Sequence, residues 1–481
     1  MTDSYESLFI GGEWVDADPA AAIGVTSAST GEPIGSVAGA REPDVDAAVA
    51  AARRAFDDPD GWSQWEPARR AAAMESLAAE MESRAEEMAR RVSSQNGMPI
   101  AISPLLEGGF PVLVIRFIAG LLADAVFEED VPSILGGTTT MRREPMGVVG
   151  AIVPWNYPQT LAAFKYAPAM AAGCAIVLKP SPETVLDAML FAEAVAAAGI
   201  PPGVINIIPG DREVGAYLVQ HPDVDKVAFT GSTAAGRWIA ETCGRLLRPV
   251  TLELGGKSAA IVLDDADLDL AKIGESFFAA TLVNNGQTCY LGTRVLAPSS
   301  RYDEVVDTVA AFASSLTVGD ALDPATQIGP MASQRHRERV EGYIAKGVGD
   351  GARLVAGGGR PRGLDAGWFV QPTVFADVDN NSTIAQEEIF GPVLSVIRYT
   401  DTDDAVRIAN ASDYGLGGSV WTSDPERGKA VARRVRTGTI GINGYAPDPA
   451  VPFGGIKASG IGRELGPNAI GSYQQFKSIY S

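Results

Sequence analysis

The sequence predicts an α/β protein with two doubly wound parallel-sheet domains. Short β-rich apolar segments begin near residue 147, each ended by Pro or Gly, and amphipathic stretches alternate with them. A second series of the same kind starts near residue 258 and continues to about 444. Strand–helix alternation at this spacing produces βαβ units and a parallel sheet covered on both faces. The length of 481 residues also exceeds one ordinary core.

Amphipathic helices are expected first, at 44–56 and 68–94, where apolar residues recur at helical spacing. The first series then follows. Its expected strands are "GVVGAIVPW", "CAIVLKP", "VINIIPG" and "DKVAFTG", and its expected helices span 158–172, 184–198, 212–220 and 233–247. The second series begins with "SAAIVLDDAD", a helix near 268–284, "TRVLAPSS" and a helix near 301–315.

Two segments fall outside these series. Residues 131–144 are typical of an exposed hairpin, and the tail "GSYQQFKSIYS" predicts one more short strand. Exposed strand edges can pair with another chain, although ordinary edge strands would give the same pattern.

The composition argues against several classes of protein. The net charge is −20, with no cluster of Lys and Arg of the kind that binds nucleic acid. No run of 18 uninterrupted apolar residues predicts a membrane span, and the first residues lack a signal-peptide pattern. Three scattered cysteines favour a reducing cytoplasm, and Cys174 and Cys243 are expected in the core. No metal is expected, because Cys and His are not clustered at zinc-ligand spacing.

The stretch "VDKVAFTGSTAAGRW" predicts a phosphate site. It reads as strand, tight turn and helix, with Gly231 and Gly236 bracketing the turn and Ser232 opening the helix. A helix N-terminus offers free N–H groups and partial positive charge to phosphate, although a glycine-capped turn alone would look the same. Lys179, at the end of a neighbouring strand, adds a cation where ligands of open parallel sheets bind. Together the two features suit a dinucleotide.

Cys289, near the end of "NNGQTCY", is the candidate nucleophile, because it follows a glycine and polar residues rather than an apolar run. A nucleophilic thiol needs a base or a depressed pKa. Neither histidine, His221 or His336, has a context that suggests catalysis. Glu253 lies among apolar residues, and burial would raise its pKa towards the range of a general base. A Glu paired with a backbone group or a cation is the alternative.

These residues belong to stretches that resemble the aldehyde dehydrogenase superfamily, in its hydrolytic, non-CoA-acylating branch. The resemblance covers nearly the whole chain. The matching stretches are "PWNYP" (154–158), "KPS" (179–181), "FTGST" (229–233), "LELGGKS" (252–258), "GQTC" (286–289), "EEIFGPV" (387–393) and "PFGGIKASGIGRE" (452–464). The implied reaction is the NAD(P)-dependent oxidation of an aldehyde to a carboxylic acid.

The resemblance implies a role for each matching residue. Cys289 would form a thiohemiacetal and then a thioacyl enzyme, and Glu253 would activate the water that hydrolyses it. Asn156 and the backbone N–H of Cys289 would form the oxyanion hole. The implied cofactor-binding residues are Trp155, Lys179, Gly231, Ser232, Glu388 and Phe390. The implied tunnel residues, which favour an apolar or aromatic aldehyde, are Tyr157, Leu161, Phe164, Tyr290 and Phe453.

The resemblance also implies an architecture. A Rossmann-like NAD(P)-binding domain would comprise 1–122 and 146–255, and a catalytic thiol domain 256–445. A small β oligomerisation element would comprise 123–145 and 446–481. Members of the family are homodimers or homotetramers, and no nucleic-acid or membrane partner is implied.

The turn after Lys179 departs from the family pattern. NAD-preferring members often carry Glu three residues after the lysine, where this chain has Pro182, followed by Glu183. The acidic surroundings would repel a 2′-phosphate and favour NAD, with Glu183 as the replacement ligand. Arg212 is the residue that could instead accept the phosphate of NADP. NAD is therefore the expected cofactor, with NADP possible.

Two other functions fit the same scaffold. In a CoA-acylating semialdehyde dehydrogenase, CoA takes the acyl group and the glutamate is absent, so Glu253 argues against that reading. A non-catalytic binding or structural protein would have no reason to keep Cys289, Glu253 and Asn156 together.

Overall fold

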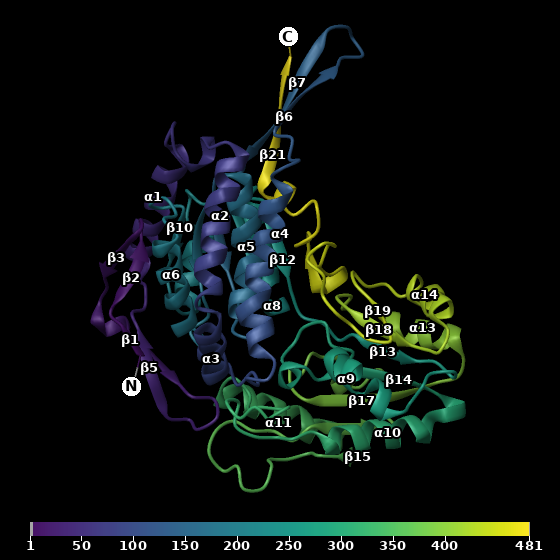
Figure 1. Ribbon diagram of the computed structural model, residues 1–481. Coiled ribbons are helices and arrows are strands. Elements are labelled where there is room, and N and C mark those ends of the chain that lie inside the picture. Colours follow the sequence, from purple (N-terminus) through teal and green to yellow (C-terminus); the bar gives the residue numbers. More distant parts are fainter. Residues whose placement is uncertain (1–2, 481) are drawn as a thin grey trace.

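The computed structural model describes residues 3–480 and contains two α/β units, with a narrow three-stranded sheet projecting from them (Figure 1). Each unit is built on a central, largely parallel sheet with helices on both faces. The predicted fold class is confirmed.

The first unit contains an eight-stranded sheet. Its strands, in spatial order, are β20 (Gly460–Ile461), β12 (Val250–Glu253), β11 (Lys226–Thr230), β8 (Val148–Ile152), β9 (Ala175–Lys179), β10 (Ile205–Ile207), β2 (Ser7–Ile10) and β3 (Glu13–Asp16). The run from β12 to β10 is parallel, β20 and β2 pair antiparallel with its two edges, and β3 pairs antiparallel with β2. β20 comes from the segment 446–481, which the sequence assigned to the oligomerisation element. The domain boundaries otherwise stay a prediction.

Helices cover both faces of this sheet because successive residues of a strand point to opposite sides. In β9, Ile176 and Leu178 pack in one core, and Ala175 and Val177 pack in the other. The first core includes residues of α2 (Pro67–Glu82), α3 (Ala85–Asn96), α4 (Phe110–Leu121), α5 (Pro158–Ala172) and α6 (Leu186–Ala197). The second includes residues of α1 (Glu42–Asp57), α7 (Arg212–Gln220) and α8 (Thr233–Arg245).

The second unit repeats this arrangement around a seven-stranded sheet. Its strands are β15 (Arg353–Ala356), β16 (Thr373–Ala376), β17 (Val393–Tyr399), β14 (Arg294–Pro298), β13 (Ala259–Val262), β18 (Gly418–Trp421) and β19 (Gly441–Ile442), with β15 antiparallel and the rest parallel. One face packs against α9 (Leu270–Thr281) and α10 (Tyr302–Ser315). The other packs against α11 (Gln334–Gly349), α12 (Thr383–Gln386), α13 (Thr402–Asn410) and α14 (Pro425–Ala432).

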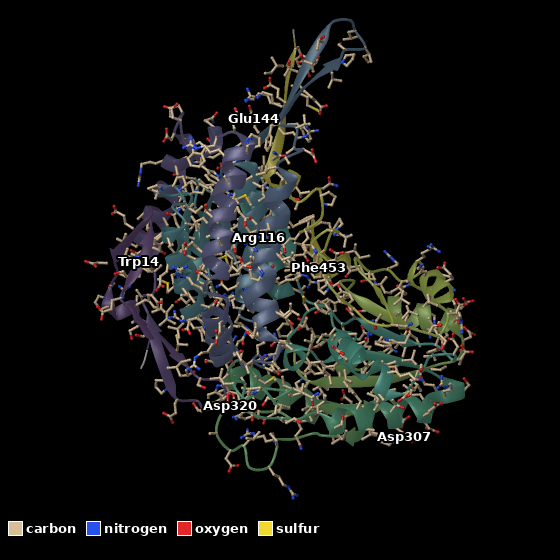
Figure 2. All side chains as sticks on the ribbon, viewed as in Figure 1. Trp14, Arg116, Glu144, Asp307, Asp320 and Phe453 are labelled. Carbon is tan, nitrogen blue, oxygen red and sulfur yellow. The ribbon has the colours of Figure 1, made fainter. Side chains whose placement is uncertain are left out.

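The projecting sheet joins the predicted hairpin to the predicted tail strand. Its antiparallel order is β21 (Gln474–Tyr480), β7 (Thr138–Pro145) and β6 (Glu128–Pro132). An ion pair between Lys477 and Glu144 (2.7 Å) joins β21 to β7, and Figure 2 labels Glu144 near the base of the projection. A further small sheet, near the N-terminus, comprises β1 (Asp3–Tyr5), β5 (Pro33–Val37) and β4 (Ile23–Thr26).

Two helix predictions need correction. The stretch 68–94 forms α2 and α3, which are separated by Ser83 and Arg84. α1 begins before Asp44, whose side chain accepts a hydrogen bond from the backbone N–H of Arg41 (2.8 Å) and so acts from inside the first turn.

The helix whose last part is α4 was not predicted from the sequence. A π-helical turn, Pro104–Gly109, leads into it, and together they are long and apolar enough to cross a membrane by length and composition. A core helix of a folded domain passes the same test. α4 packs against α2 and α5, and its residues Val114, Ile115 and Ile118 are fully buried in the first core.

Candidate active site

Four candidate residues lie at the carboxyl ends of neighbouring parallel strands in the first sheet. β9 ends at Lys179 and β12 ends at Glu253, while Asn156 and Ser232 follow the ends of β8 and β11. Ligands of open parallel sheets bind at this edge. The fold therefore brings together motifs that are far apart in the sequence.

Cys289 lies in a loop of the second unit that reaches this edge. The loop turns through Asn284 and Asn285, whose φ angles of 52° and 61° are left-handed, a conformation that asparagine tolerates better than most residues. The Asn156 amide donates to the carbonyl of Gln287 (2.9 Å), and the Asn284 amide donates to the carbonyl of Asn156 (3.0 Å). These two hydrogen bonds hold the loop that carries Cys289 against the loop that carries Asn156.

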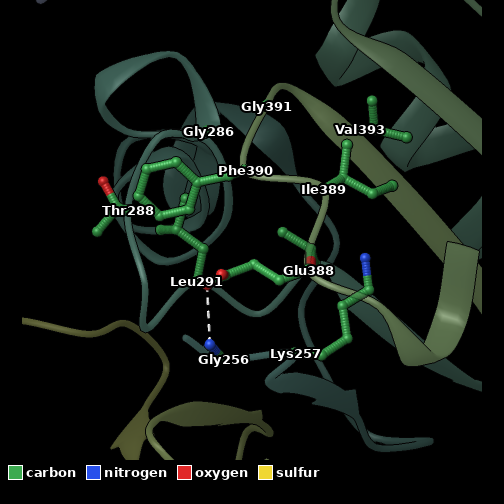
Figure 3. Close-up of a pocket in the computed structure, with 11 residues that line it drawn as sticks. Gly256, Lys257, Gly286, Thr288, Leu291, Glu388, Ile389, Phe390, Gly391 and Val393 are labelled. Carbon is green, nitrogen blue, oxygen red and sulfur yellow. Dashed lines mark hydrogen bonds between the residues drawn. The ribbon is translucent and has the colours of Figure 1, made fainter. Parts of the chain in front are cut away.

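The Gly-Gly pair after Glu253 allows three parts of the site to approach one another. A Cβ at Gly256 would lie 2.3 Å from the carbonyl oxygen of Cys289, and one at Gly255 would lie 2.5 Å from a carboxyl oxygen of Glu388. The N–H of Gly256 also donates to Glu388 Oε1 (2.8 Å; Figure 3). The lack of side chains at these two positions allows Glu388 and the backbone of Cys289 to lie against the segment that follows Glu253.

The Glu253 carboxyl is buried, and neither of its oxygens has a well-formed hydrogen bond. Burial raises its pKa well above the ordinary value, and the charge of Glu464 raises it further. The charge of Lys165 lowers this pKa, although Lys165 is itself paired with Glu464 (2.8 Å). The backbone N–H of Gly455 also lowers it, but its geometry falls short of a hydrogen bond. A buried carboxyl with free oxygens and a raised pKa suits a general base.

The environment of the Cys289 thiol favours its protonated form. Burial raises the pKa of Cys289, and the charges of Glu388 and Glu253 raise it further, so both carboxyls lie within electrostatic reach. The residue is partly exposed, less open than its polar sequence context suggested. Cys174 and Cys243 are fully buried, which confirms their core assignment.

Lys179 is buried rather than a solvated residue at a strand end. Its Nζ donates to the carbonyls of Pro180 (2.9 Å) and Gly210 (2.7 Å), which leaves one N–H for a ligand. Burial lowers the pKa of Lys179 to about 8, although the charges of Glu183 and Asp211 raise it. A cation held by two carbonyls is well placed to bind a ribose hydroxyl.

The N-terminus of α8 lies where the sequence predicts a phosphate site. Ser232 caps the helix, with its Oγ accepting from the N–H of Ala235 (3.3 Å), so its hydroxyl proton can still be donated. The N–H of Gly231 donates to the carbonyl of Glu253 (3.0 Å), which holds the turn on the neighbouring strand. A Cβ at Gly236 would meet the Leu254 side chain at 2.4 Å, so the helix packs closely against the sheet.

Glu388 and Phe390 line a small pocket with Gly256 and Lys257 (Figure 3). Burial raises the pKa of Glu388 to about 7, while the bond from Gly256 and the charge of Lys257 lower it. The Trp155 ring meets the Phe390 ring edge-on, with centroids 5.4 Å apart. Trp155 from the first unit and the segment 387–390 from the second therefore face each other.

The two residues proposed for cofactor choice flank Lys179. Glu183 accepts a hydrogen bond from the Ser181 hydroxyl, and its charge acts on Lys179. Arg212 is exposed and begins α7, just after Gly210, whose carbonyl binds Lys179. Glu183 and Arg212 therefore both lie near the part of a ligand that would bind Lys179.

The expected tunnel residues belong to one apolar cluster, which Cys289 also contacts: Tyr157, Leu161, Phe164, Tyr290 and Phe453. The ring of Phe164 lies 6.2 Å from that of Phe110 and 6.3 Å from that of Phe453. Figure 2 shows Phe453 between the two units. The Tyr157 hydroxyl is paired with Thr288 Oγ1 (2.8 Å). Tyr157 and Tyr290 also lie within electrostatic reach of the Cys289 thiol, so aromatic side chains are among its neighbours.

Sequence reasoning missed three residues of the site. Tyr445 stacks on Tyr290 with centroids 4.2 Å apart, and Phe110 extends the aromatic cluster. His336, whose sequence context did not suggest catalysis, has its ring centroid 5.0 Å from that of Trp155. Among residues 3–480, no three His, Cys, Asp or Glu side chains form a group that could hold a metal ion.

The chain has extensive similarity to known proteins. Residues 14–479 match the aldehyde dehydrogenase family. A relative described as geranial dehydrogenase, from Castellaniella defragrans, is 57% identical over 480 residues, covering 100% of this chain and 99% of the relative. A betaine aldehyde dehydrogenase from Rhizobium leguminosarum is 41% identical, covering 98% of this chain and 96% of that protein.

Solved structures agree with the sequence comparisons. An aldehyde dehydrogenase of Mycobacterium tuberculosis, complexed with NAD⁺, has a TM-score of 0.96 and 48% identity, covering 100% of this chain and 98% of that one. A cysteine-to-alanine variant of aldehyde dehydrogenase C from Pseudomonas syringae, with NAD⁺ and octanal, has a TM-score of 0.94 and 39% identity, covering 100% and 98%. On this evidence, and with the thiol, carboxyl and amide motifs gathered at one sheet edge, the chain belongs to the aldehyde dehydrogenase family.

Proposed function

We propose that this protein oxidises apolar aldehydes to carboxylic acids with NAD, through a thioacyl intermediate on Cys289. The observation that carries the proposal is the meeting of Cys289, Asn156 and the unpaired carboxyl of Glu253 beside an aromatic cluster. A structural protein would gain nothing from a buried carboxyl whose oxygens make no well-formed hydrogen bond, because such a group lowers stability.

In the proposed reaction, the thiol of Cys289 gives its proton to solvent water as its sulfur bonds to the aldehyde carbon, and the C=O π bond opens onto the carbonyl oxygen. The second N–H of the Asn156 amide and the backbone N–H of Cys289 donate to the carbonyl oxygen as it becomes negative. When bound, NAD supplies the nicotinamide carbon that accepts the hydride. Glu253 then takes a proton from water, the hydroxide attacks the thioester, and the carbon–sulfur bond breaks to release the acid.

The residues at the sheet edge fit NAD. Lys179 keeps one free N–H beside the carboxylate of Glu183, a pair suited to two ribose hydroxyls. The capped start of α8 offers N–H groups to a pyrophosphate. The position of Glu388 on the pocket of Figure 3 supports a contact with the second ribose. The neighbour complexed with NAD⁺ supports the same cofactor here.

The aromatic cluster supports an apolar substrate. The Tyr157 and Tyr445 hydroxyls are paired with Thr288 and Thr439, so their rings rather than their polar groups line the approach to the thiol. The relative described as geranial dehydrogenase and the neighbour bound to octanal both carry names of apolar aldehydes. A linear or branched aldehyde of about eight to ten carbons is the substrate class we propose.

Replacing Asn156 by alanine is expected to lower kcat by about 10²–10³-fold, because one oxyanion donor is lost. Asn156→Asp keeps the size of the side chain but removes the donor, so it should be as slow. The check is steady-state kinetics with a saturating apolar aldehyde, together with thermal unfolding of each variant. A variant that keeps wild-type kcat would contradict the oxyanion assignment.

Removing the Glu183 carboxylate is expected to narrow the preference for NAD over NADP by about tenfold or more. A charge-assisted hydrogen bond contributes about 1.5–3 kcal/mol, and the lost charge no longer repels the 2′-phosphate. The measurement is kcat/KM with each cofactor for the wild type and Glu183→Ala, with Glu213→Ala as an exposed control on α7. If the wild type prefers NADP, Arg212 becomes the residue assigned to cofactor selection. Arg212→Ala should then raise KM for NADP alone.

We also infer a homodimer or homotetramer in the cytoplasm. The projecting sheet exposes most of its side chains and ends in unpaired strand edges, which a second copy can cover. Three free cysteines suit a reducing compartment. No nucleic-acid or membrane partner is part of the proposal.

The direct test of the proposed activity is NADH formation, followed by absorbance, across a panel of aldehydes with NAD and with NADP. Apolar aldehydes of medium length should give the highest kcat/KM. Highest kcat/KM with small or charged aldehydes would refute the substrate class, and no activity with any aldehyde would refute the function.

A further inference from the structure

The segment 387–390 contains a strained residue that needs external support. Phe390 has a φ angle of 64°, a left-handed conformation that is unfavourable for a bulky side chain. Such conformations persist only where the surrounding structure holds them, and they are common at ligand sites. The neighbouring Glu388 is the proposed ligand of the nicotinamide ribose.

One face of α11 supplies that support through three hydrogen bonds. His336 Nε2 bonds to the carbonyl oxygen of Phe390 (2.6 Å), and Arg339 donates to the carbonyl oxygen of Glu388 (2.7 Å). The Tyr343 hydroxyl donates to a carboxyl oxygen of Glu387 (2.7 Å). The three donors are spaced three and four residues apart, so they share one face of the helix.

The hydrogen bond between His336 and the carbonyl of Phe390 also determines which ring nitrogen carries the proton. A carbonyl oxygen only accepts hydrogen bonds, so Nε2 must carry the proton. The ring lies 5.0 Å from that of Trp155 and 5.9 Å from that of Phe390, while Trp155 and Phe390 are 5.4 Å apart. His336 therefore completes a triangle of rings that joins the Trp155–Asn156 loop of the first unit to the segment 387–390 of the second.

We propose that His336, Arg339 and Tyr343 are positioning residues that hold the segment 387–390 in its strained conformation, and thereby place Glu388 and Phe390 for the nicotinamide end of the cofactor. The consequence for cofactor binding rests on the proposed function. The support itself is a property of the free protein and can be measured without any ligand.

Hydrogen–deuterium exchange of the free protein tests the support. His336→Ala should speed exchange in peptides that cover 387–391, because the carbonyl of the strained residue Phe390 loses its hydrogen bond to α11. Tyr343→Phe, which removes one hydroxyl, is the milder second variant and should have the same effect to a smaller degree. Lys346→Ala is the matched control, since Lys346 is exposed on the same helix and pairs with Asp350 (3.3 Å) rather than with the segment 387–390. Unchanged exchange in His336→Ala would overturn the proposal.

Titration of each variant with NADH, followed by fluorescence, tests the consequence. His336→Ala should weaken NADH binding by about tenfold, as expected for one lost hydrogen bond at a positioned site. His336→Gln should restore most of the affinity, because its amide nitrogen can donate to the same carbonyl. Failure of His336→Ala to weaken binding, or failure of glutamine to rescue it, would overturn the proposal.

Glu388→Gln separates this inference from the proposed function. If Glu388→Gln leaves NADH binding unchanged, the ribose assignment fails, and the exchange data alone decide whether α11 holds the segment. If Glu388→Gln weakens binding while His336→Ala does not, the positioning role is wrong and the ribose assignment stands.

Discussion

Replacing Cys289 by alanine is expected to lower aldehyde oxidation by at least about 10⁴-fold while NAD binding is retained. The thiol is the atom that bonds to the substrate, and neither Cys174 nor Cys243 can substitute, because both are fully buried in the core. Steady-state NADH formation and a separate NADH titration measure the two properties.

Alkylation gives a matched control for this prediction. A thiol reagent should inactivate the wild type with modification of Cys289, and Cys243→Ala should be inactivated at the same rate. Activity of Cys289→Ala near that of the wild type would refute the nucleophile, as would inactivation that follows modification of another cysteine.

Replacing Glu253 by glutamine is expected to leave a burst of NADH but to slow turnover by about 10²–10⁴-fold. Hydride transfer precedes the hydrolytic step, so loss of the base that activates water should leave the acyl enzyme to accumulate. Stopped-flow absorbance distinguishes the burst from the steady state. Loss of the burst together with turnover would mean that Glu253 also removes the proton from the thiol.

The burial of Glu253 determines whether turnover rises or falls with pH. The pKa of Glu253 is raised well above its ordinary value, so the ionised base increases as pH rises through that raised pKa. Wild-type kcat should therefore rise with pH over this range, and Glu253→Gln should lose the rise. A pH profile that is the same in both would show that another group limits hydrolysis.

Residues within local motifs were predictable from the sequence. The strands around Lys179 and Glu253 are short apolar runs with a polar end, and the left-handed asparagines before Cys289 belong to the "NNG" turn that drew attention to it. These features depend on neighbours in the sequence, which is why pattern and composition revealed them.

Features that depend on distant contacts were not predictable. His336 lies among charged residues of α11, and its role depends on Phe390, which the chain reaches only after two strands and a short helix. Lys179 was predicted as a ligand-binding cation at a strand end, but its burial and its bond to the carbonyl of Gly210 depend on a segment 31 residues away. The helix that contains α4 was not predictable because Gly108, Gly109 and Pro111 interrupt its helical pattern.

Mass spectrometry of Glu253→Gln, acid-quenched after mixing with NAD and an apolar aldehyde, tests the central claim most directly. The account predicts that the peptide containing Cys289 gains the mass of the acyl group, in proportion to the NADH formed in the burst, and that Cys289→Ala shows neither. NADH formation without an acyl group on Cys289, or an acyl group on a different residue, would contradict the account.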